Sequence, residues 1–188
     1  RAARLDRSAH PFCSGMAPTD VRITTRYDER QLTQSLYGVV HESGHALYEQ
    51  GLEEKNIGTP LGEAVSLGIH ESQSRLWENL IGRSRPFVAW LLPQLKKAFP
   101  RQLKGVGAEA FYRAVNRVEP SLIRVEADEV TYNLHVLLRY EIEKALIAGE
   151  IAVRDLPAIW NARMEEYLGV RPASDAEGVL QDVHWSAG

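Results

Sequence analysis

The stretch YGVVHESGHALYEQG (Tyr37–Gly51) holds two histidines four residues apart, with a glutamate directly after the first. Residues four apart on an α-helix project from one face, with their Cβ atoms about 5–6 Å apart. His41 and His45 can therefore bind one ion of the size of zinc, while Glu42 reaches a water molecule on that ion. The stretch predicts a metal site on a helix. The alternative is a solvent-exposed helix that carries these residues without binding a metal.

The residues around this stretch predict the helix that carries it. Asp28 and Gln31 have the spacing of a capping box, and apolar side chains follow them at helical intervals. Gly51 is of the residue type favoured just beyond a helix C-terminus. The expected helix covers roughly residues 28–50. Gly44 in its interior costs about 1 kcal/mol relative to Ala, so its presence indicates that another segment packs closely there.

A catalytic zinc ion takes three protein ligands and keeps one position open, so the site needs a third side chain. The candidates are Glu49, Glu63, His70 and Glu71. Glu49 extends the row on the same helix and cannot close a tripod around the ion. A ligand from the next predicted helix, about residues 60–82, approaches from the opposite side. On that helix Glu71 completes the two-histidine, one-glutamate set of many metal-dependent peptidases. His70 points about 100° away from Glu71 and suits contact with a ligand or with substrate better than ligation.

The rest of the sequence predicts a mainly α-helical protein that forms one domain over residues 1–188. With 188 residues, 44% of them hydrophobic, the chain can bury a sizeable core. Further helices are expected at about residues 85–98, 107–116, 119–148 and 155–168. Residues 1–27 lack sustained periodicity, so a loop-rich lead-in is expected there, with a short β element at 21–26.

Composition narrows the classes of partner and the compartment. The net charge is −3, which provides no basic field for nucleic acid or for an anionic membrane. No apolar run approaches the roughly 18–20 residues that span a bilayer. Cys13 is the single cysteine, which excludes an internal disulfide and suits a reducing compartment such as the cytoplasm. The first residues, RAARLDRSAH, contain neither an initiator Met nor an apolar signal core, so the chain is expected to be an excised part of a longer protein.

These residues resemble a known family. HESGHALYEQG followed by HESQSRLWEN closely resembles the M32 metallocarboxypeptidases, the thermostable carboxypeptidase Taq family. Four further blocks occur in the family's order: HPF (His10–Phe12), DVRIT (Asp20–Thr24), IRVEAD (Ile123–Asp128) and GVLQDVHW (Gly178–Trp185). The resemblance extends over nearly the whole chain and is far more specific than the HExxH pattern alone.

The resemblance implies a helical enzyme with a deep groove and one divalent ion. Zinc is the expected ion, with cobalt or manganese as alternatives. The resemblance also implies release of single amino acids from peptides with free C-termini, by attack of a metal-bound water whose proton Glu42 accepts. By position in its motif, the family's third ligand falls on Glu71. Family members are much longer, and a later segment contributes an active-site tyrosine, so this chain alone is expected to be poorly active. The full-length enzyme is expected to be a homodimer.

An exopeptidase also needs a cation for the terminal carboxylate of its substrate. Arg124 in IRVEAD is the candidate, because the planar fork of Arg matches a carboxylate. The alternative is a surface pair with Asp128 on a helix, which contributes only a few tenths of a kcal/mol. Arg22 in DVRIT is the reserve candidate, or a structural partner of an acidic neighbour.

The remaining polar residues of the motifs have two interpretations each. Gln181 and His184 are expected to contact the peptide backbone or the oxyanion. Asp20 and Asp182 can accept the free N–H of a ligand histidine, or can cap a helix or a turn. Two other functions stay open: an endopeptidase with the same metal site, and a non-catalytic helical fragment or paralogue that retains the metal motifs.

Overall fold

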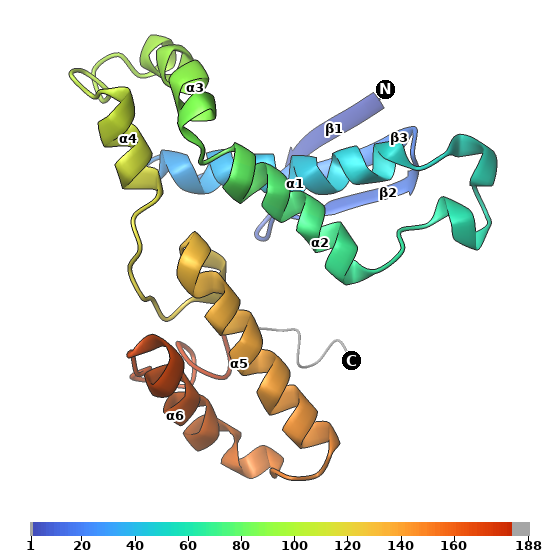
Figure 1. Ribbon diagram of the computed structural model, residues 1–188, viewed down its shortest axis with the longest axis vertical. Coiled ribbons are helices and arrows are strands. Elements are labelled where there is room, and N and C mark those ends of the chain that lie inside the picture. The colour runs from blue at the N-terminus through green and yellow to red at the C-terminus, as the bar shows by residue number, and fades with distance from the viewer. Residues whose placement is uncertain (1, 182–188) are drawn as a thin grey trace. The chain divides into compact units, whose positions relative to one another are not determined.

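The computed structural model describes residues 2–181. The chain divides into two compact units, Arg1–Val115 and Asn116–Gly188, and the single domain over residues 1–188 stays a prediction. The predicted class is confirmed, since the chain is mainly helical with one small sheet (Figure 1). Among the described residues, no helix is both long enough and apolar enough to cross a membrane.

The first unit opens with a sheet of β1 (Ala2–Arg7), β2 (Cys13–Ala17) and β3 (Asp20–Thr25). The strand order is β1-β3-β2, with β1 parallel and β2 antiparallel to β3. The loop-rich lead-in expected over residues 1–27 is therefore wrong, although the β element expected at 21–26 is confirmed. The exposed β2 lacks the apolar alternation that marks a half-buried strand.

The HESGH stretch lies on α1 (Leu32–Gly51), which packs against β2, β3 and α2 (Figure 1). The predicted helix is confirmed, but it begins at Leu32, four residues after the predicted start. The prediction of a capping box is wrong. Gln31 is the N-cap residue and makes no side-chain cap hydrogen bond. Asp28 instead accepts a hydrogen bond from the Arg30 amide at 2.7 Å, which turns the chain ahead of the helix.

The single helix expected over residues 60–82 is broken into three elements. These are a 3-10 turn at Pro60–Gly62, then α2 (Leu67–Arg75), then a π-helix (Leu76–Ile81). The break falls at Ser66, which is extended and caps α2 by accepting a hydrogen bond from the Ile69 amide at 3.2 Å. Ser at an N-cap satisfies one of the free amides of the first turn, so α2 begins there.

Two further helices complete the first unit. These are α3 (Arg85–Ala98) and α4 (Ala108–Val115), and they confirm the helices predicted at 85–98 and 107–116. The core between these helices and α1 consists of buried apolar side chains: Tyr37, Val88, Leu91, Leu92, Leu95, Phe111 and Val115.

The second unit contains α5 (Glu129–Ile147) and α6 (Leu156–Leu168). The helix predicted from residue 119 starts ten residues late because Asp128 caps it, accepting hydrogen bonds from the Val130 and Thr131 amides at 2.9 and 3.0 Å. The core of the second unit comprises Leu138, Ile142, Trp160, Met164, Leu168 and Val179. Other 3-10 turns in the chain lie at Glu54–Asn56, Arg124–Glu126 and Val153–Asp155.

Candidate metal centre

Two helices of the first unit bring together three side chains that can hold a metal ion. His41 and His45 lie on α1, and Glu71 approaches them from α2. Its Oε2 atom lies 3.6 Å from His41 Nε2 and 3.3 Å from His45 Nε2, and all three donor atoms are within 4.8 Å of one another. A tetrahedral zinc ion with bonds of about 2.0–2.2 Å separates its ligand atoms by roughly 3.3–3.5 Å. The donor set therefore fits one divalent ion.

The two helices approach so closely because α1 has no side chain at Gly44. A Cβ atom at this position would lie 2.6 Å from Ser74 Cα and 2.7 Å from the Gln73 carbonyl oxygen. The sequence predicts such a close approach, and the structure confirms it. The contact at Gln73 and Ser74 holds α2, and Glu71 with it, against the histidine face of α1.

The environment of Glu71 favours its ionised form. Burial raises the pKa of this carboxyl, but the hydrogen bond to His45 and the charges of His41 and Arg75 outweigh it and lower the pKa to about 2. Arg75 Nε donates to Glu71 Oε1 at 3.1 Å. A carboxylate with so low a pKa is available as a negatively charged ligand at neutral pH.

Glu42 lies beside the ligand histidines and is buried, with only 5% of its surface exposed. Burial raises the pKa of this carboxyl, an effect that nearby His41 and His45 oppose. A carboxyl with a raised pKa accepts and returns a proton closer to neutral pH than an exposed one. The position and the pKa both suit a general base.

The outward nitrogen of His41 meets a carboxylate that sequence reasoning missed. Glu78 Oε2 lies 2.8 Å from His41 Nδ1. Arg75 Nη1 contacts the same oxygen at 3.1 Å, and Arg83 Nη2 contacts Oε1 at 3.3 Å. The spacing of Glu71, Arg75 and Glu78, at i, i+4 and i+7, was a usable signal because such residues share one helix face.

The outward nitrogen of His45 meets another histidine. His70 Nδ1 lies 2.6 Å from His45 Nδ1, and His70 Nε2 lies 2.7 Å from Glu49 Oε1. His70 thus contacts a ligand histidine and adds no atom to the ligand group. Glu49, considered as a ligand from the sequence, is the far partner of His70.

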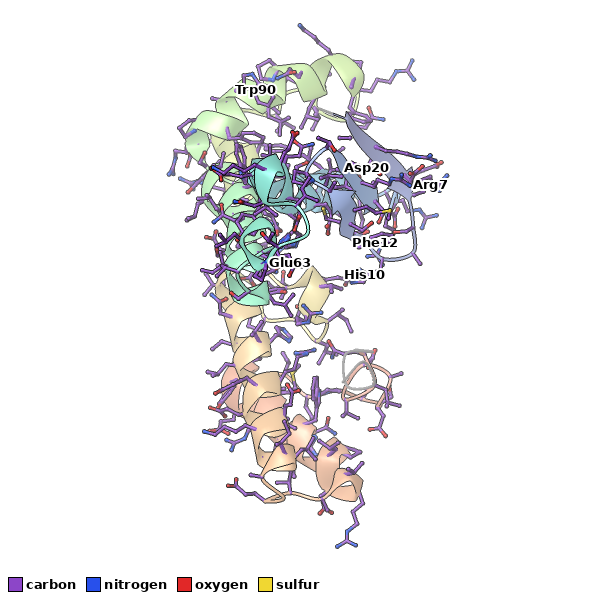
Figure 2. The ribbon with its side chains drawn as sticks, turned by 90° about the vertical axis from the view of Figure 1, so that its right-hand side faces the viewer. Arg7, His10, Phe12, Asp20, Glu63 and Trp90 are labelled. Atoms are coloured by element: carbon purple, nitrogen blue, oxygen red, sulfur yellow. The ribbon has the colours of Figure 1, made fainter. Side chains whose placement is uncertain are left out.

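The structure places other predicted residues of the first unit away from the ligand nitrogens. Asp20 binds Arg22 through two hydrogen bonds, Nε to Oδ1 at 3.0 Å and Nη2 to Oδ2 at 2.9 Å. Glu78 and His70 contact the outward nitrogens of His41 and His45, for which the sequence suggests Asp20. Glu63 is exposed and lies on the loop that precedes α2, and Asp20 lies on the sheet (Figure 2).

In the second unit, Arg124 lies in a 3-10 turn, and the helix expected to carry it begins only at residue 129. Its Nη1 atom donates to the Tyr132 hydroxyl at 2.7 Å. Asp128, which the sequence offers as its helical partner, caps α5 instead.

Gln181 has both ends of its amide engaged within the second unit. Its Oε1 accepts from the Arg124 amide at 3.1 Å and from Arg139 Nη2 at 2.9 Å, and its Nε2 donates to the carbonyls of Leu122 and Glu177. Contact with the substrate backbone would have to replace these bonds. Asp182 and His184 lie outside the described residues.

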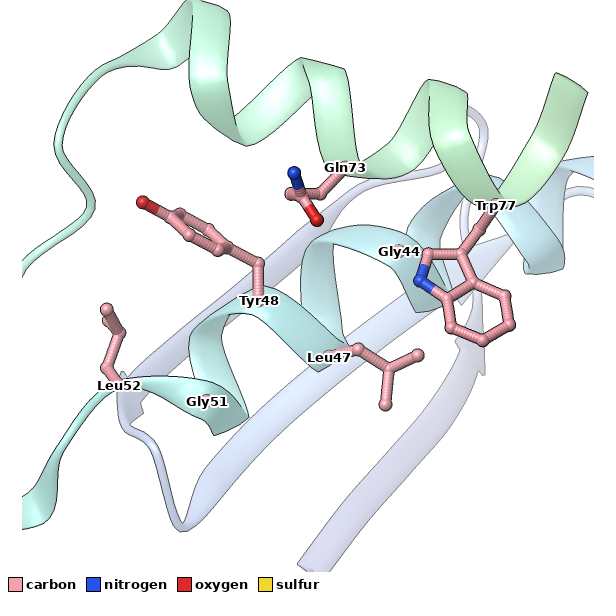
Figure 3. Close-up of a pocket in the computed structure, with 7 residues that line it drawn as sticks. All are labelled: Gly44, Leu47, Tyr48, Gly51, Leu52, Gln73 and Trp77. Carbon is pink, nitrogen blue, oxygen red and sulfur yellow. The ribbon is translucent and has the colours of Figure 1, made fainter. Parts of the chain in front are cut away.

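A separate hollow of about 270 Å³ lies beside α1 and α2 (Figure 3). The residues that line it are Gly44, Leu47, Tyr48, Gly51, Leu52, Gln73 and Trp77. None of the three candidate metal ligands is among them. The hollow is therefore distinct from the metal centre.

Known proteins have sequences closely similar to this chain over nearly its whole length. Thermostable carboxypeptidase 1 of Thermus thermophilus is 56% identical over 187 residues, which is 100% of this chain and 36% of that protein. Carboxypeptidase 1 of Bacillus subtilis is 50% identical over 185 residues, 98% of this chain and 37% of its own length. The chain thus spans little more than a third of the length of these curated relatives.

Solved structures agree with the sequence relationship. The crystal structure of an M32 carboxypeptidase from Deinococcus radiodurans superposes with a TM-score of 0.95 at 55% identity, over 99% of this chain and 37% of that one. Residues 1–188 match the family model described as carboxypeptidase Taq (M32) metallopeptidase. Membership of this family implies a divalent metal, for which the His41, His45 and Glu71 group offers ligands. This chain therefore belongs to the carboxypeptidase Taq (M32) metallopeptidase family.

Proposed function

We propose that the protein is a metal-dependent carboxypeptidase and that His41, His45 and Glu71 hold its divalent ion. The observation that carries the proposal is the approach of Glu71 Oε2 to the Nε2 atoms of both histidines, at 3.6 and 3.3 Å. Two imidazoles and one carboxylate are a common protein donor set at catalytic zinc sites. The curated relatives are themselves named carboxypeptidases, which supports the reaction type.

The residues around the site suit peptide hydrolysis. A divalent ion bound there acts as a Lewis acid, which polarises the scissile carbonyl and acidifies water. Glu42 accepts the proton of the attacking water and returns it to the nitrogen of the leaving amino acid. Burial raises the pKa of Glu42 against the opposing charges of His41 and His45, which makes it a better proton acceptor than an exposed carboxylate. Glu78 and His70 contact the Nδ1 atoms of His41 and His45, which would leave each Nε2 lone pair available to hold the ion.

Zinc is the proposed metal, with cobalt and manganese as alternatives. Imidazole and carboxylate ligands accept all three ions, and selection among them depends on availability as well as on affinity. The homodimer and the cytoplasmic location that the sequence suggests stay predictions. Zinc content of the purified protein, measured with and without added manganese or cobalt, identifies the preferred ion.

Arg124 is the proposed clamp for the terminal carboxylate of the substrate. The resemblance of IRVEAD to the family motif supports it, and the Tyr132 hydroxyl holds one guanidinium nitrogen at 2.7 Å. Arg22 is the weaker candidate because Asp20 already engages its guanidinium through two nitrogens. Two other residues are proposed substrate contacts. Gln181 could contact substrate only after the hydrogen bonds of its side-chain amide are released. The position of His70 is better explained by its contact with His45.

Hydrolysis of matched peptides with free and amidated C-termini tests the proposal in the intact protein. The wild type should prefer free ends. Arg124→Ala should lower kcat/KM on free-acid peptides. The expected loss of transition-state stabilisation is about 2–4 kcal/mol, the usual loss for one partner of a desolvated charge pair. Metal content should stay unchanged. Arg171→Ala, which removes an exposed arginine paired with Glu165, is the matched control.

The outcomes separate the alternatives. Equal cleavage of free and amidated peptides, with products from within the chain, would identify an endopeptidase. Stoichiometric metal without turnover on either substrate would identify a non-catalytic paralogue. If Arg124→Ala discriminates between the two ends as sharply as the wild type, Arg124 is not the clamp.

A further inference from the structure

We propose that His70 and Glu49 form a hydrogen-bonded chain that fixes the tautomer and the orientation of His45, so that both are positioning residues for the metal ion. The inference rests on the proposed metal site. It starts from two short contacts in series, His45 Nδ1 to His70 Nδ1 at 2.6 Å and His70 Nε2 to Glu49 Oε1 at 2.7 Å. Both distances are short enough for hydrogen bonds.

The order of the protons along this chain follows from the metal-binding atom. His45 faces Glu71 with Nε2, and a ligating nitrogen carries no proton, so the proton of a neutral His45 is on Nδ1. His45 Nδ1–H therefore donates to His70 Nδ1, which must present its lone pair. The single proton of His70 then lies on Nε2 and is donated to Glu49, a carboxylate that can only accept when it is ionised. Each of the three groups has one possible role.

The surroundings hold His70 in this orientation. His45, Tyr48 and Glu49 lie at i, i+3 and i+4 on the last turns of α1, so all three present one face to His70. The Tyr48 ring packs edge-to-face on the His70 ring, with centroids 5.0 Å apart. The Tyr48 hydroxyl accepts a hydrogen bond from the Val65 amide at 3.3 Å. This bond ties the segment just before α2 to the same face.

The two ligand histidines are thus supported in different ways. A carboxylate, Glu78, contacts His41 directly, whereas the charge of Glu49 reaches His45 only through the His70 ring. The side chains of His45 and His70 are 16% and 18% exposed, and Glu49 is 28% exposed. These hydrogen bonds are partly shielded from water. Loss of either partner should therefore loosen the His45 imidazole and weaken binding of the ion.

The affinity for Zn²⁺, measured in the intact protein by competition with a chromophoric chelator, tests the chain. Changes in the groups that orient metal ligands typically cost 10–100-fold in affinity. We expect a loss of about that size for His70→Phe and about tenfold for Glu49→Ala. Glu49→Gln keeps an acceptor oxygen for His70 Nε2–H and should lose less than Glu49→Ala. Glu54→Ala, which removes an exposed carboxylate from the turn after α1, should bind Zn²⁺ as the wild type does.

The double variant gives the sharpest test, because the chain has an order. Once His70 is replaced, Glu49 has no route to His45, so Glu49→Ala should cost nothing further in the His70→Phe background. Equal losses from Glu49→Ala in both backgrounds would overturn the proposal. Thermal unfolding of the metal-free variants separates positioning from general damage. If His70→Phe does not fold, the difference between Glu49→Gln and Glu49→Ala decides, and equal affinities of these two would also overturn it.

Two further variants keep this inference distinct from the proposed site. If His41→Ala and Glu71→Ala lose the metal while the His70 and Glu49 variants bind it normally, the positioning chain is wrong and the site stands. If His41→Ala and Glu71→Ala bind Zn²⁺ with wild-type affinity, the proposed site itself is wrong.

Discussion

A Cβ atom on Gly44 would lie 2.6 Å from the Cα atom of Ser74, well inside the distance at which carbon atoms repel. Gly44 belongs to the HESGH stretch itself, between the candidate ligands His41 and His45 on α1. Ser74 belongs to α2, one turn beyond Glu71. The contact between these two backbones therefore determines how far Glu71 stands from His41 and His45.

Gly44→Ala should separate the two helices. Alanine favours an isolated helix by about 1 kcal/mol over glycine, but the clash is with backbone atoms that cannot turn away. We expect a net loss of about 1–3 kcal/mol in unfolding free energy, the usual cost of overpacking, together with weaker metal binding. Gly51→Ala is the matched control, since a Cβ there meets no atom within 4 Å. A Gly44→Ala variant as stable as Gly51→Ala would contradict the close approach.

Replacement of the ligands tests the composition of the metal site. His41→Ala, His45→Ala and Glu71→Ala should each lose stoichiometric metal, because a site with two protein ligands holds an ion weakly. Glu63→Ala removes an exposed carboxylate on the loop before α2 and should retain it. Metal analysis of the purified proteins reads the result. Full occupancy in Glu71→Ala would remove that residue as the third ligand.

Glu42→Gln should separate metal binding from turnover. The amide keeps the shape of the side chain but cannot accept a proton, so the variant should bind metal normally and lose about 10²–10⁴-fold in kcat. The pair of measurements is metal content and hydrolysis of a peptide with a free C-terminus. Near-normal turnover would exclude Glu42 as the general base.

Glu78→Gln should weaken metal binding and change the pH dependence of stability. Burial raises the pKa of this carboxyl, but the hydrogen bond to His41 and the charge of Arg75 outweigh it, and the pKa lies below its ordinary value of 4.5. A depressed folded-state pKa contributes stability above the unfolded pKa and loses it as pH falls through the folded value. The gap in unfolding free energy between the wild type and Glu78→Gln should therefore be full above pH 4.5 and shrink in more acid solution.

Denaturant unfolding at several pH values measures this gap. Zn²⁺ affinity should fall about tenfold in Glu78→Gln at neutral pH. Glu109→Gln, at an exposed carboxylate paired with Arg85 and Arg113, controls for the loss of one negative charge. Identical stability curves for the wild type and Glu78→Gln would show that the contact with His41 contributes nothing.

Cys13 should react slowly with thiol reagents. Burial above all, and then the charges of Glu42 and Glu49, raise the pKa of its thiol to about 12. The thiolate is the reactive form, so at pH 8 the native protein should alkylate about a thousandfold more slowly than a free cysteine thiol. The rate should keep rising up to about pH 12 and should match that of a simple thiol after unfolding in urea. A plateau near pH 9 in the native protein would place Cys13 in a more exposed setting.

The sequence alone determined the features that depend on local spacing. The i, i+4 interval of His41 and His45 places both imidazoles on one helix face in any right-handed helix. The helix predicted at 85–98 is confirmed at both ends. Its start has a local cause, because Ser84 caps it and Pro86 stands in its first turn. Family membership was likewise readable, since it rests on the order of short motifs along the chain.

Only the tertiary structure decided which distant groups meet the histidines. Glu49, Glu63, His70 and Glu71 were all candidates for the third ligand, and their distances depend on how α2 packs on α1 after an irregular connection. The contacts of Glu78 with His41 and of His70 with His45 arise from the same packing. Strands β1 and β2 of the small sheet were missed for a related reason, since β1 pairs with β3 across residues distant in sequence. Local propensity specifies the helices, but the approach of Gly44 to Ser74 sets the geometry of the site.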